Sequence, residues 1–311
     1  MNLAIGVDLG ATLIKFALVD QTGTIVWNNI QPTEANHSAE KVFENIKICI
    51  QNAIKQAQQF KSEIAGIGIG IPGIIDYGIL IGGANNLPNW EMVEIKKILE
   101  NDFNLPVFVD NDANLAGLAE VRYGSAKGAS DMIFLTIGTG IGGAMILNGE
   151  LYGGHRNRGG EFGHIIIEKN GKSCTCGARG CFEICASTEA LIKDYKELLS
   201  KNQISIDSEI DGKFIVNKYL KNDLNAVKAM NNHFDYLATG ISSIINIFSP
   251  EKVVIGGGIS EAGDFYIENI RQRVFKIAMK ETSSNTTIDL SVLGNKAGML
   301  GAAALVFENL K

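Results

Sequence analysis

Short apolar, β-branched runs alternate along this chain with glycine-rich turns and with longer stretches of helical periodicity. The first half opens with three such runs, LAIGVD, LIKFALVD and TIVWNNI, and the second half repeats the plan with MIFLTIG and GGAMILNGELYG. Runs of this kind predict buried strands joined by tight connections. Because the plan occurs twice, we expect a duplicated domain with a cleft between its halves.

Helices and further strands follow each of these hairpins. Additional strands are predicted at IAGIGIGIPG, PVFVDND and KVVIGGG. The long helix of the second half has Asp223 at its start and Ser249-Pro250 as its stop. Helical periodicity covers residues 38–59, 91–101, a segment from Ala113, 223–248 and 296–309. The alternation predicts an α/β fold.

Two lobes are expected from the length of 311 residues, because domains usually have about 100–200 residues. The N-terminal lobe is predicted to comprise residues 1–118 and 296–311, and the C-terminal lobe residues 119–295. The last helix would then return to the first lobe. The hinge is expected near residues 118–124, since no Pro/Ser-rich or charge-rich linker marks the boundary.

Composition and charge restrict the partners and the compartment. The net charge of -6 argues against a nucleic-acid partner, which favours a basic patch. The N-terminus, MNLAIGVDLG, lacks the basic start and apolar core of a signal peptide, and no apolar run reaches the about 18 residues that span a bilayer. We therefore expect a soluble, cytoplasmic protein without a membrane partner.

One histidine and three of the five cysteines gather in GGEFGHIIIEKNGKSCTCGARGCFE. Nine residues separate His164 from Cys174, one separates Cys174 from Cys176, and four separate Cys176 from Cys181. One imidazole with three thiolates is a ligand set of closed, tetrahedral zinc sites. Glycines 171, 177 and 180 fall where the chain must turn tightly around a metal. The alternative is a group of buried or disulfide-bonded thiols, which a cytosolic compartment disfavours.

Three glycine turns at strand ends are candidates for holding the phosphates of ATP. The turn of DLGAT offers Asp8, Gly10, Ala11 and Thr12, with Mg²⁺ held nearby by phosphate oxygens, water and Asp8. The other two turns offer Thr136, Gly138, Thr139 and Gly140 in TIGTGIGG, and Gly256, Gly257 and Gly258 in VIGGG. Each turn alone is weak evidence and favours an ordinary tight turn, whereas three at strand ends favour a nucleotide site. A dinucleotide-binding fingerprint fits less well, because the strand-like AMIL follows the second turn.

Carboxylates supply the candidate proton-transfer and acceptor groups. Asp112 lies at the end of the predicted strand VFVDN, where a carboxylate can take the proton of an attacking hydroxyl. The alternative role for Asp112 is a helix N-cap. Asp110 is expected to serve the structure or a metal-bound water. Glu161 and Glu183 flank the cysteine cluster and are candidates to accept hydrogen bonds from sugar hydroxyls, the alternative being exposed glutamates on a zinc loop.

The segments DLGAT, GIPG with a following Asp76, NLPNW, VDNDAN, TIGTGIGG, GGEFGH, CTCGARGCFE and VIGGGI resemble, in this order and over nearly the whole chain, the ROK family of sugar kinases and repressors. The resemblance implies a duplicated actin/hexokinase-like (ribonuclease H-like) two-lobed fold with an interlobe cleft and a structural zinc loop. It implies the first phosphate loop and part of the sugar site in the N-terminal lobe. The second phosphate loop, the zinc loop and the adenosine site would belong to the C-terminal lobe.

The same resemblance assigns roles to individual residues. Asp112 is implied as the general base. Zinc would be held by His164, Cys174, Cys176 and Cys181. The implied sugar contacts are Gly73, Asn86, Asn111, Asp112, Glu161, His164 and Glu183. A zinc ion on one ring nitrogen of His164 would leave the other nitrogen to donate to a sugar hydroxyl.

A few positions depart from the family pattern or remain outside it. Ala11 stands where a second glycine is commoner, and Leu13 where Lys or Asn is frequent, yet Thr12 keeps its hydroxyl, so we expect ATP binding to survive. Arg156 and Arg158 make the segment HRNRG unusually basic; phosphate and a partner subunit are alternatives to the default expectation, solvent. Cys49 and Cys185 are expected to be packed thiols.

The resemblance implies ATP-dependent phosphorylation of a hexose hydroxyl, with glucose O6 as the first expected acceptor. The alternative substrates are N-acetylmannosamine and other hexoses or N-acetylhexosamines. A sugar-responsive repressor is the competing class, and we expect it less because the first phosphate-loop strand starts at Leu3, ahead of which family regulators carry a winged helix. A catalytically idle sugar sensor is a third class, disfavoured by Asp112 and the phosphate loops. A homodimer is expected by analogy.

Overall fold

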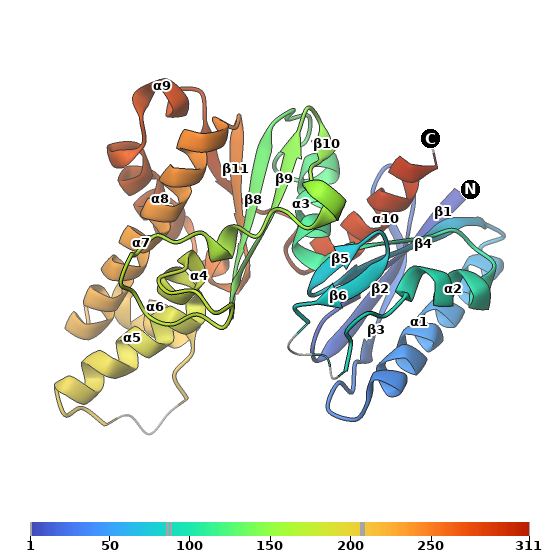
Figure 1. Ribbon diagram of the computed structural model, residues 1–311, viewed down its shortest axis with the longest axis horizontal. Coiled ribbons are helices and arrows are strands. Elements are labelled where there is room, and N and C mark those ends of the chain that lie inside the picture. The colour runs from blue at the N-terminus through green and yellow to red at the C-terminus, as the bar shows by residue number, and fades with distance from the viewer. Residues whose placement is uncertain (1, 85–86, 88, 206–208, 311) are drawn as a thin grey trace. The chain divides into compact units, whose positions relative to one another are not determined.

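The duplication predicted from the sequence is visible in two sheets of the same topology (Figure 1). This computed structural model describes residues 2–84, 87, 89–205 and 209–310. The first five-stranded sheet has the order β3-β2-β1-β4-β7, and the second has the order β10-β9-β8-β11-β12. In each sheet, the first three strands in sequence lie on one side and two later strands are added on the other. The two halves of the chain therefore repeat one folding plan.

Two compact units divide the chain. One comprises Met1–Ser130, Ala144–Gly160 and Val292–Lys311, and the other comprises Asp131–Gly143 and Glu161–Ser291. The predicted division lay at residues 118/119 and 295/296. The C-terminal segment does return to the first unit, but residues 119–130 and 144–160 also belong to it. The division into two lobes with separate roles in ligand binding stays a prediction.

The sheet of the first unit combines an antiparallel and a parallel part. The strands are β1 (Asn2–Leu9), β2 (Leu13–Val19), β3 (Ile25–Pro32), β4 (Glu63–Ile71) and β7 (Val107–Asn111). β1 pairs antiparallel with β2 and β2 antiparallel with β3, whereas β1, β4 and β7 are parallel neighbours. A two-stranded sheet, β5 (Ile74–Asp76) and β6 (Ile79–Gly82), follows β4. The carboxyl ends of the three parallel strands consequently lie at one edge.

The helices of the first unit are α1 (Ala39–Gln59), α2 (Ile95–Phe103), α3 (Asp112–Tyr123) and α10 (Ala297–Asn309). Ser38 caps α1 by accepting from the backbone N–H of Lys41, as its place ahead of an amphipathic run predicts. The expected helix at 91–101 is wrong at its start, because Glu94 is the cap and the helix begins at Ile95. Residues 91–94 form bends and an isolated bridge instead.

Alternate residues of β1 face two different apolar layers, as the period of a strand requires. Leu3, Ile5 and Val7 pack in a cluster that includes the buried face of α1. Ala4 belongs to a second cluster, with residues of α3 and α10. Gly68 of β4 allows the close approach of α10, since a Cβ there would lie 1.8 Å from the carbonyl oxygen of Ala302. This packing fixes α3, and with it the residue at its N-terminus.

The second unit holds the remaining parallel strands and most of the helical mass. The strands of the second sheet are β8 (Met132–Ile137), β9 (Ile141–Leu147), β10 (Glu150–Leu151), β11 (Lys252–Gly256) and β12 (Thr287–Leu290). β11 is parallel to both β8 and β12, and β9 pairs antiparallel with β10. β9 passes from the second unit into the first at Gly143. The turn between β8 and β9 and the end of β11 thus meet at one edge of this sheet.

The helices of the second unit are α4 (Phe182–Ala186), α5 (Thr188–Lys201), α6 (Gly212–Leu220), α7 (Leu224–Phe248), α8 (Asp264–Ile277) and α9 (Lys280–Ser283). α7 contacts α4, α5, α6, α8 and α9, so it is the central helix of this unit (Figure 1). Its predicted limits are confirmed. Asp223 accepts from the N–H of Ala226 at the start, and Ser249 adopts the left-handed conformation at the end.

Short 3₁₀ turns complete the fold at η1 (His155–Asn157), η2 (Phe162–His164), η3 (Gly258–Ala262) and η4 (Gly294–Lys296). Of these, η1 to η3 carry residues singled out from the sequence. Within the part of the chain that the structure describes, no helix combines the length and the apolar character needed to cross a membrane.

Candidate functional site

The carboxyl ends of β1 and β7 carry the aspartates of the first unit. In the parallel register Asp8 is opposite Gly70, and Gly70 is opposite Asp110. Asp112 follows two residues after Asp110, as the first residue of α3. The edge at which parallel strands end is where ligands commonly bind in α/β folds. The predicted acceptor and phosphate residues of this unit are therefore brought to one edge.

Asn111 is the N-cap of α3, so the alternative role for Asp112 as a helix N-cap is wrong. The side-chain oxygen of Asn111 accepts from the N–H groups of Ala113 at 2.8 Å and Asn114 at 3.2 Å. Its Nδ2 donates to the carbonyl of Gly73 at 2.9 Å. These bonds give Asn111 a positioning role at the start of the helix. Its contact with a sugar stays a prediction.

Asp112 is a partly buried carboxylate in the first turn of α3. Burial raises its pKa above the ordinary value of an aspartate, and the N–H of Ala113, which donates to Oδ1 at 2.9 Å, opposes that rise. A carboxylate with a raised pKa is a stronger base once it is ionised. The site can therefore hold a general base at this position.

Asp8 also has a perturbed pKa, raised to about 6 chiefly by burial. Lys15 lowers it from a distance of 3.8 Å between Nζ and Oδ2, whereas the charge of Asp112 raises it further. Gly298 leaves the room that this carboxylate occupies, because a Cβ there would lie 2.5 Å from Cγ of Asp8. Lys15 is a charged neighbour that the sequence reasoning missed, although it lies directly opposite Asp8 in the antiparallel register.

Asp110 is buried and serves the structure, in line with one of its expected roles. Its Oδ1 accepts from Nδ2 of Asn114 at 2.8 Å and from the N–H of Asn111 at 2.7 Å. The side chain of Asn157 also acts on it and lowers its pKa. Burial raises the pKa of Asp110, and these donors oppose the rise.

The first glycine turn, residues 10–12, is closed by hydrogen bonds from both sides. The N–H of Gly10 donates to the carbonyl of Leu13 at 3.0 Å, and the N–H of Thr33 donates to the carbonyl of Thr12 at 2.9 Å. Ala11 and Thr12 are both exposed. Leu13 is 39% exposed. The turn is consequently accessible to a phosphate.

The two arginines of the HRNRG segment do not point to solvent alone, so the default expectation for them is wrong. Both are ion-paired with Asp76, whose side chain is 4% exposed. Nη2 of Arg156 lies 2.9 Å from Oδ2, and Nη2 of Arg158 donates to the same oxygen. Of the two remaining sugar-pocket candidates, Gly73 accepts from Asn111, and Asn86 lies outside the described residues.

A hollow of about 590 Å³ in the second unit gathers residues of two glycine turns. Gly138 and Thr139 line it from the β8–β9 turn, and Gly258 lines it from the turn after β11. The rest of the lining comes from α5, α6 and η3, including Thr188, Lys213, Asn217 and Glu261, none of which the sequence reasoning found. The size matches the range of small-ligand sites. This hollow is the candidate nucleotide pocket.

The remaining glycine-turn residues do not line this hollow. Thr136 is the register partner of Gly256 in the β8–β11 ladder. Gly257 has φ 93° and packs so tightly that a Cβ would lie 2.1 Å from the carbonyl oxygen of Ile137. Gly140 accepts a hydrogen bond from the N–H of Gly138 at 2.9 Å. Among the predicted nucleotide residues of this unit, Gly138, Thr139 and Gly258 thus line the hollow, whereas the others make backbone contacts of the two turns and strands.

His164, Cys174, Cys176 and Cys181 converge as predicted, with their ligand atoms all within 4.8 Å of one another. Sγ of Cys174 lies 3.8 Å from Nδ1 of His164, and Sγ of Cys176 lies 3.6 Å from Sγ of Cys181. Metal–sulfur distances of about 2.3 Å in a tetrahedron give separations of this size. The donor set therefore fits a closed zinc site, with Nδ1 of His164 turned to the thiols.

The loop that carries these cysteines is held by its own backbone. The N–H groups of Ile167 and Cys174 donate to the carbonyls of Gly180 and Ala178, and Gly177 and Gly180 have the positive φ values of 93° and 70°. The predicted tight turns at these two glycines are confirmed. We call residues 164–181 the zinc loop.

The two glutamates beside the zinc loop differ in setting. Glu161 is exposed, and its carbonyl accepts from the N–H of His164 at 3.0 Å. Glu183 is partly buried on α4, where Oε2 accepts from the N–H of Ile141 at 3.0 Å. The alternative of an exposed glutamate therefore fails for Glu183.

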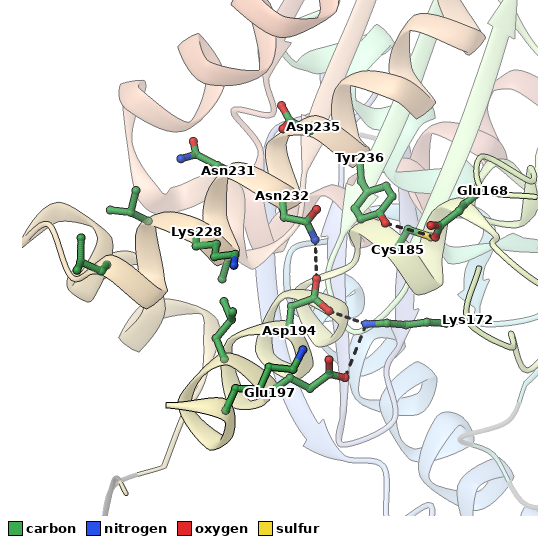
Figure 2. Close-up of a pocket in the computed structure, with 15 residues that line it drawn as sticks. Glu168, Lys172, Cys185, Asp194, Glu197, Lys228, Asn231, Asn232, Asp235 and Tyr236 are labelled. Atoms are coloured by element: carbon green, nitrogen blue, oxygen red, sulfur yellow. Dashed lines mark hydrogen bonds and ion pairs between the residues drawn. The ribbon is translucent and has the colours of Figure 1, made fainter. Parts of the chain in front are cut away.

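A second hollow, of about 700 Å³, borders the zinc loop and is lined by α4, α5 and α7 (Figure 2). Oε2 of Glu168 accepts from the hydroxyl of Tyr236 at 3.3 Å and the thiol of Cys185 at 3.7 Å, and Lys172 is ion-paired with Asp194 at 2.5 Å. Cys185 is 6% exposed, and burial raises its pKa to about 11. Cys185 and the buried Cys49 are packed thiols, as predicted.

Comparison with known proteins agrees with this architecture. The sequence matches the ROK family over residues 4–309. It is 34% identical over 312 residues to a glucokinase of Halalkalibacterium halodurans, covering 97% of this chain and 94% of that protein. It is also 33% identical over 319 residues to a putative xylose repressor of Caldicellulosiruptor sp., covering 100% of this chain and 79% of that protein.

A solved structure extends the likeness to three dimensions. The ROK family glucokinase of Streptomyces griseus, in complex with glucose and AMPPNP, superposes with a TM-score of 0.81 at 31% identity, covering 98% of this chain and 99% of that one. This protein belongs to the ROK family. Its fold is the α/β, hexokinase-like fold of that family, and its relatives include sugar kinases and repressors.

Proposed function

We propose that this protein transfers the γ-phosphoryl group of ATP to a hexose hydroxyl, with glucose as the preferred acceptor. The observation that carries the proposal is the position of Asp112. It is a carboxylate with a raised pKa, fixed at the start of α3 by the cap of Asn111. The relatives include a glucokinase and a glucokinase structure that holds glucose and AMPPNP.

Asp112 is the proposed general base. Its carboxylate takes the proton of the acceptor hydroxyl as that oxygen attacks the γ-phosphorus, and the bond to the β-phosphate oxygen breaks. Positioning and stabilisation of the developing charge supply most of the rate in such transfers. The N–H groups of the exposed Ala11 and Thr12 and the hydroxyl of Thr12 are proposed donors to phosphate oxygens. Closure of two lobes around the reactants, which excludes water, is part of the proposal.

The nucleotide is proposed to bind in the hollow of the second unit. The adenosine would pack among residues of α5 and α6, and the phosphates would meet the turns at residues 138–140 and 256–258. Mg²⁺ is proposed beside Asp8, where it would neutralise phosphate charge. Because Asp8 has a pKa of about 6, it is mostly ionised at neutral pH and suits that role.

Zinc is proposed as a structural ion held by His164 and the three cysteines. With all positions filled by protein, it supplies rigidity and no reacting group. Nδ1 of His164 faces Cys174, so Nε2 is the nitrogen proposed to donate to a sugar hydroxyl. Glu161 and Glu183 are proposed to accept from other hydroxyls of the sugar. A homodimer and a cytoplasmic location stay predictions.

The second candidate function is sugar sensing by a repressor-type protein. The similarity to a putative xylose repressor over the whole of this chain favours it. Such a protein would bind sugar without releasing ADP. A carboxylate at the position of Asp112 and a hollow lined by two glycine turns suit a phosphotransferase, so the kinase remains the first proposal.

A coupled assay of ADP release separates these functions. Glucose, N-acetylmannosamine, N-acetylglucosamine, fructose, mannose and xylose are each offered with MgATP, and a reaction without sugar is the control. The proposal expects sugar-dependent ADP release, with the highest kcat/KM for glucose. Sugar binding by calorimetry without ADP release from any of these sugars would identify a sensor and overturn the kinase.

A further inference from the structure

The loop of residues 153–160, which we call the arginine loop, is anchored to one buried carboxylate. Asp76, at the end of β5, is 3% exposed, yet it meets guanidinium groups from both Arg156 and Arg158. Nε of Arg156 also donates to Oδ1 at 3.3 Å, so both carboxylate oxygens are used. Exposed ion pairs contribute little to stability, but a buried carboxylate with two charged partners is strongly held.

The backbone of the arginine loop is strained at Arg156 and Asn157, beside the two ion pairs with Asp76. Arg156 and Asn157 both adopt positive φ values, 58° and 59°, which are uncommon for residues other than glycine. Gly153 makes room for Asn157, because a Cβ there would lie 1.7 Å from Oδ1 of that side chain. Strain of this kind persists where surrounding contacts impose it, and it is typical of ligand sites. Here the ion pairs with Asp76 are such contacts.

Asn157, between the two arginines, reaches the proposed acceptor site. Its side chain lowers the pKa of Asp110, which lies two residues before the proposed base Asp112. The same strand that ends at Asp76 is preceded by Gly73, whose carbonyl accepts from Asn111, the cap of α3. The arginine loop is therefore tied to the start of α3 by two routes, one through Asn157 and one through β5.

We propose that Asp76, Arg156 and Arg158 form a clamp that positions Asn157 at the acceptor site and so sets the affinity for the sugar. This inference rests on the proposed function and names positioning residues for it. All the residues of the clamp belong to the first unit, whereas the proposed nucleotide hollow is lined by residues of the second. Loss of the clamp therefore weakens sugar binding and leaves nucleotide binding nearly unchanged.

The test compares Asp76→Asn, Arg158→Ala, the double variant and Arg158→Lys. For each, kcat, the KM for glucose, the KM for MgATP and the midpoint of thermal unfolding are measured. We expect the KM for glucose to rise roughly ten-fold in Asp76→Asn and in Arg158→Ala, with the KM for MgATP within about two-fold. The double variant is expected to bind glucose no more weakly than Asp76→Asn alone, because Asp76→Asn already removes the ion pair that Arg158→Ala breaks. Arg158→Lys should recover part of the affinity.

Asp235→Asn is the matched control. Asp235 is ion-paired with Arg273 at 2.8 Å in the second unit, but its side chain is 69% exposed, and its substitution should leave both KM values unchanged. An unchanged KM for glucose in the clamp variants would overturn the inference. Additive effects in the double variant would show that the two residues act separately, and parallel changes in both KM values and in thermal stability would show a merely structural role. Either result would also overturn the inference.

Calorimetric titration with glucose keeps the two proposals distinguishable. If the wild-type protein binds glucose without turnover, the kinase proposal fails, and the clamp is judged by the ratio of dissociation constants between wild type and variants. If wild type phosphorylates glucose but the clamp variants bind it equally well, only the clamp fails. If wild type binds no hexose at all, both are wrong.

Discussion

The carboxylate of Glu183 accepts a hydrogen bond from the backbone N–H of Ile141, with 3.0 Å between nitrogen and oxygen. Glu183 stands two residues after the zinc-ligand candidate Cys181, and Ile141 is the first residue after the turn of residues 138–140. A Cβ on Gly140 would lie 2.3 Å from the same carboxylate oxygen, so the contact is tight. The zinc loop and the proposed phosphate turn are thus linked through one side chain.

This link predicts that removing zinc weakens nucleotide binding as well as sugar binding. Without the metal, Cys181 and the start of α4 lose their anchor, and Glu183 no longer holds the turn. A zinc-selective chelator in excess Mg²⁺ should raise the dissociation constants of glucose and of an ATP analogue, by roughly ten-fold for the sugar. Calorimetry measures the two dissociation constants, and a zinc assay measures how much metal has been removed.

Glu183→Ala serves as the partner experiment. It should weaken ATP-analogue binding while the protein keeps its zinc, whereas Glu183→Gln, which retains an acceptor oxygen, should be milder. Unchanged affinity for both ligands after complete zinc loss would show that the metal does not support either pocket.

The ionised carboxylate of Asp8 should lower the free energy of unfolding at neutral pH. Its pKa is about 6 in the folded protein against an ordinary value of 3.8, so the folded state binds the proton more tightly than the unfolded state. Stability from this group is therefore full below pH 3.8 and is lost as the pH rises through about 6. Asp8→Asn should raise the free energy of unfolding at pH 7 by roughly 2 kcal/mol, while turnover falls. Urea unfolding at pH 7 and pH 4 measures this, and a variant less stable than wild type at pH 7 would contradict it.

His233 should make the second unit sensitive to acid. Burial lowers its pKa from 6.5 to about 3, and its Nε2 lies 2.8 Å from the hydroxyl of Tyr266 in the core. The unfolded chain takes up a proton below pH 6.5 while the folded chain does not, so stability is full above that pH and is lost as the pH falls towards 3. Between pH 7 and pH 4.5, the free energy of unfolding of His233→Gln should fall by roughly 2 kcal/mol less than that of wild type. Equal losses in both proteins would exclude this role.

The strands and the long helices could be predicted from local signals. Ser38 and Asp223 each precede an amphipathic run and cap a helix, and the repeated hairpins gave the duplication. The zinc set was found because its ligands are close in sequence. The predicted start of α2 at residue 91 is wrong because Val93 pairs with the distant Leu80 in an isolated bridge, which local periodicity does not reveal.

Contacts between residues far apart in the chain could not be predicted from the sequence. Asp76 and Arg158 are 82 residues apart, and nothing in either segment identifies the partner of the other. Thr188 and Lys213 face the nucleotide hollow only because α5 and α6 pack beside the glycine turns. The assignment of residues 144–160 to the first unit likewise depends on tertiary packing, since β9 runs through the boundary without a break in its pattern.

Turnover by Asp112→Asn, compared with wild type under saturating glucose and MgATP, tests the central claim most directly. Asparagine keeps the size of the side chain and cannot take the hydroxyl proton. The account predicts that wild type forms ADP and a glucose phosphate in equal amounts, and that kcat in the variant falls by roughly 10²–10⁴-fold. Glucose binding by calorimetry should change little. A variant that turns over near the wild-type rate would remove Asp112 from its role as general base and contradict the proposed mechanism.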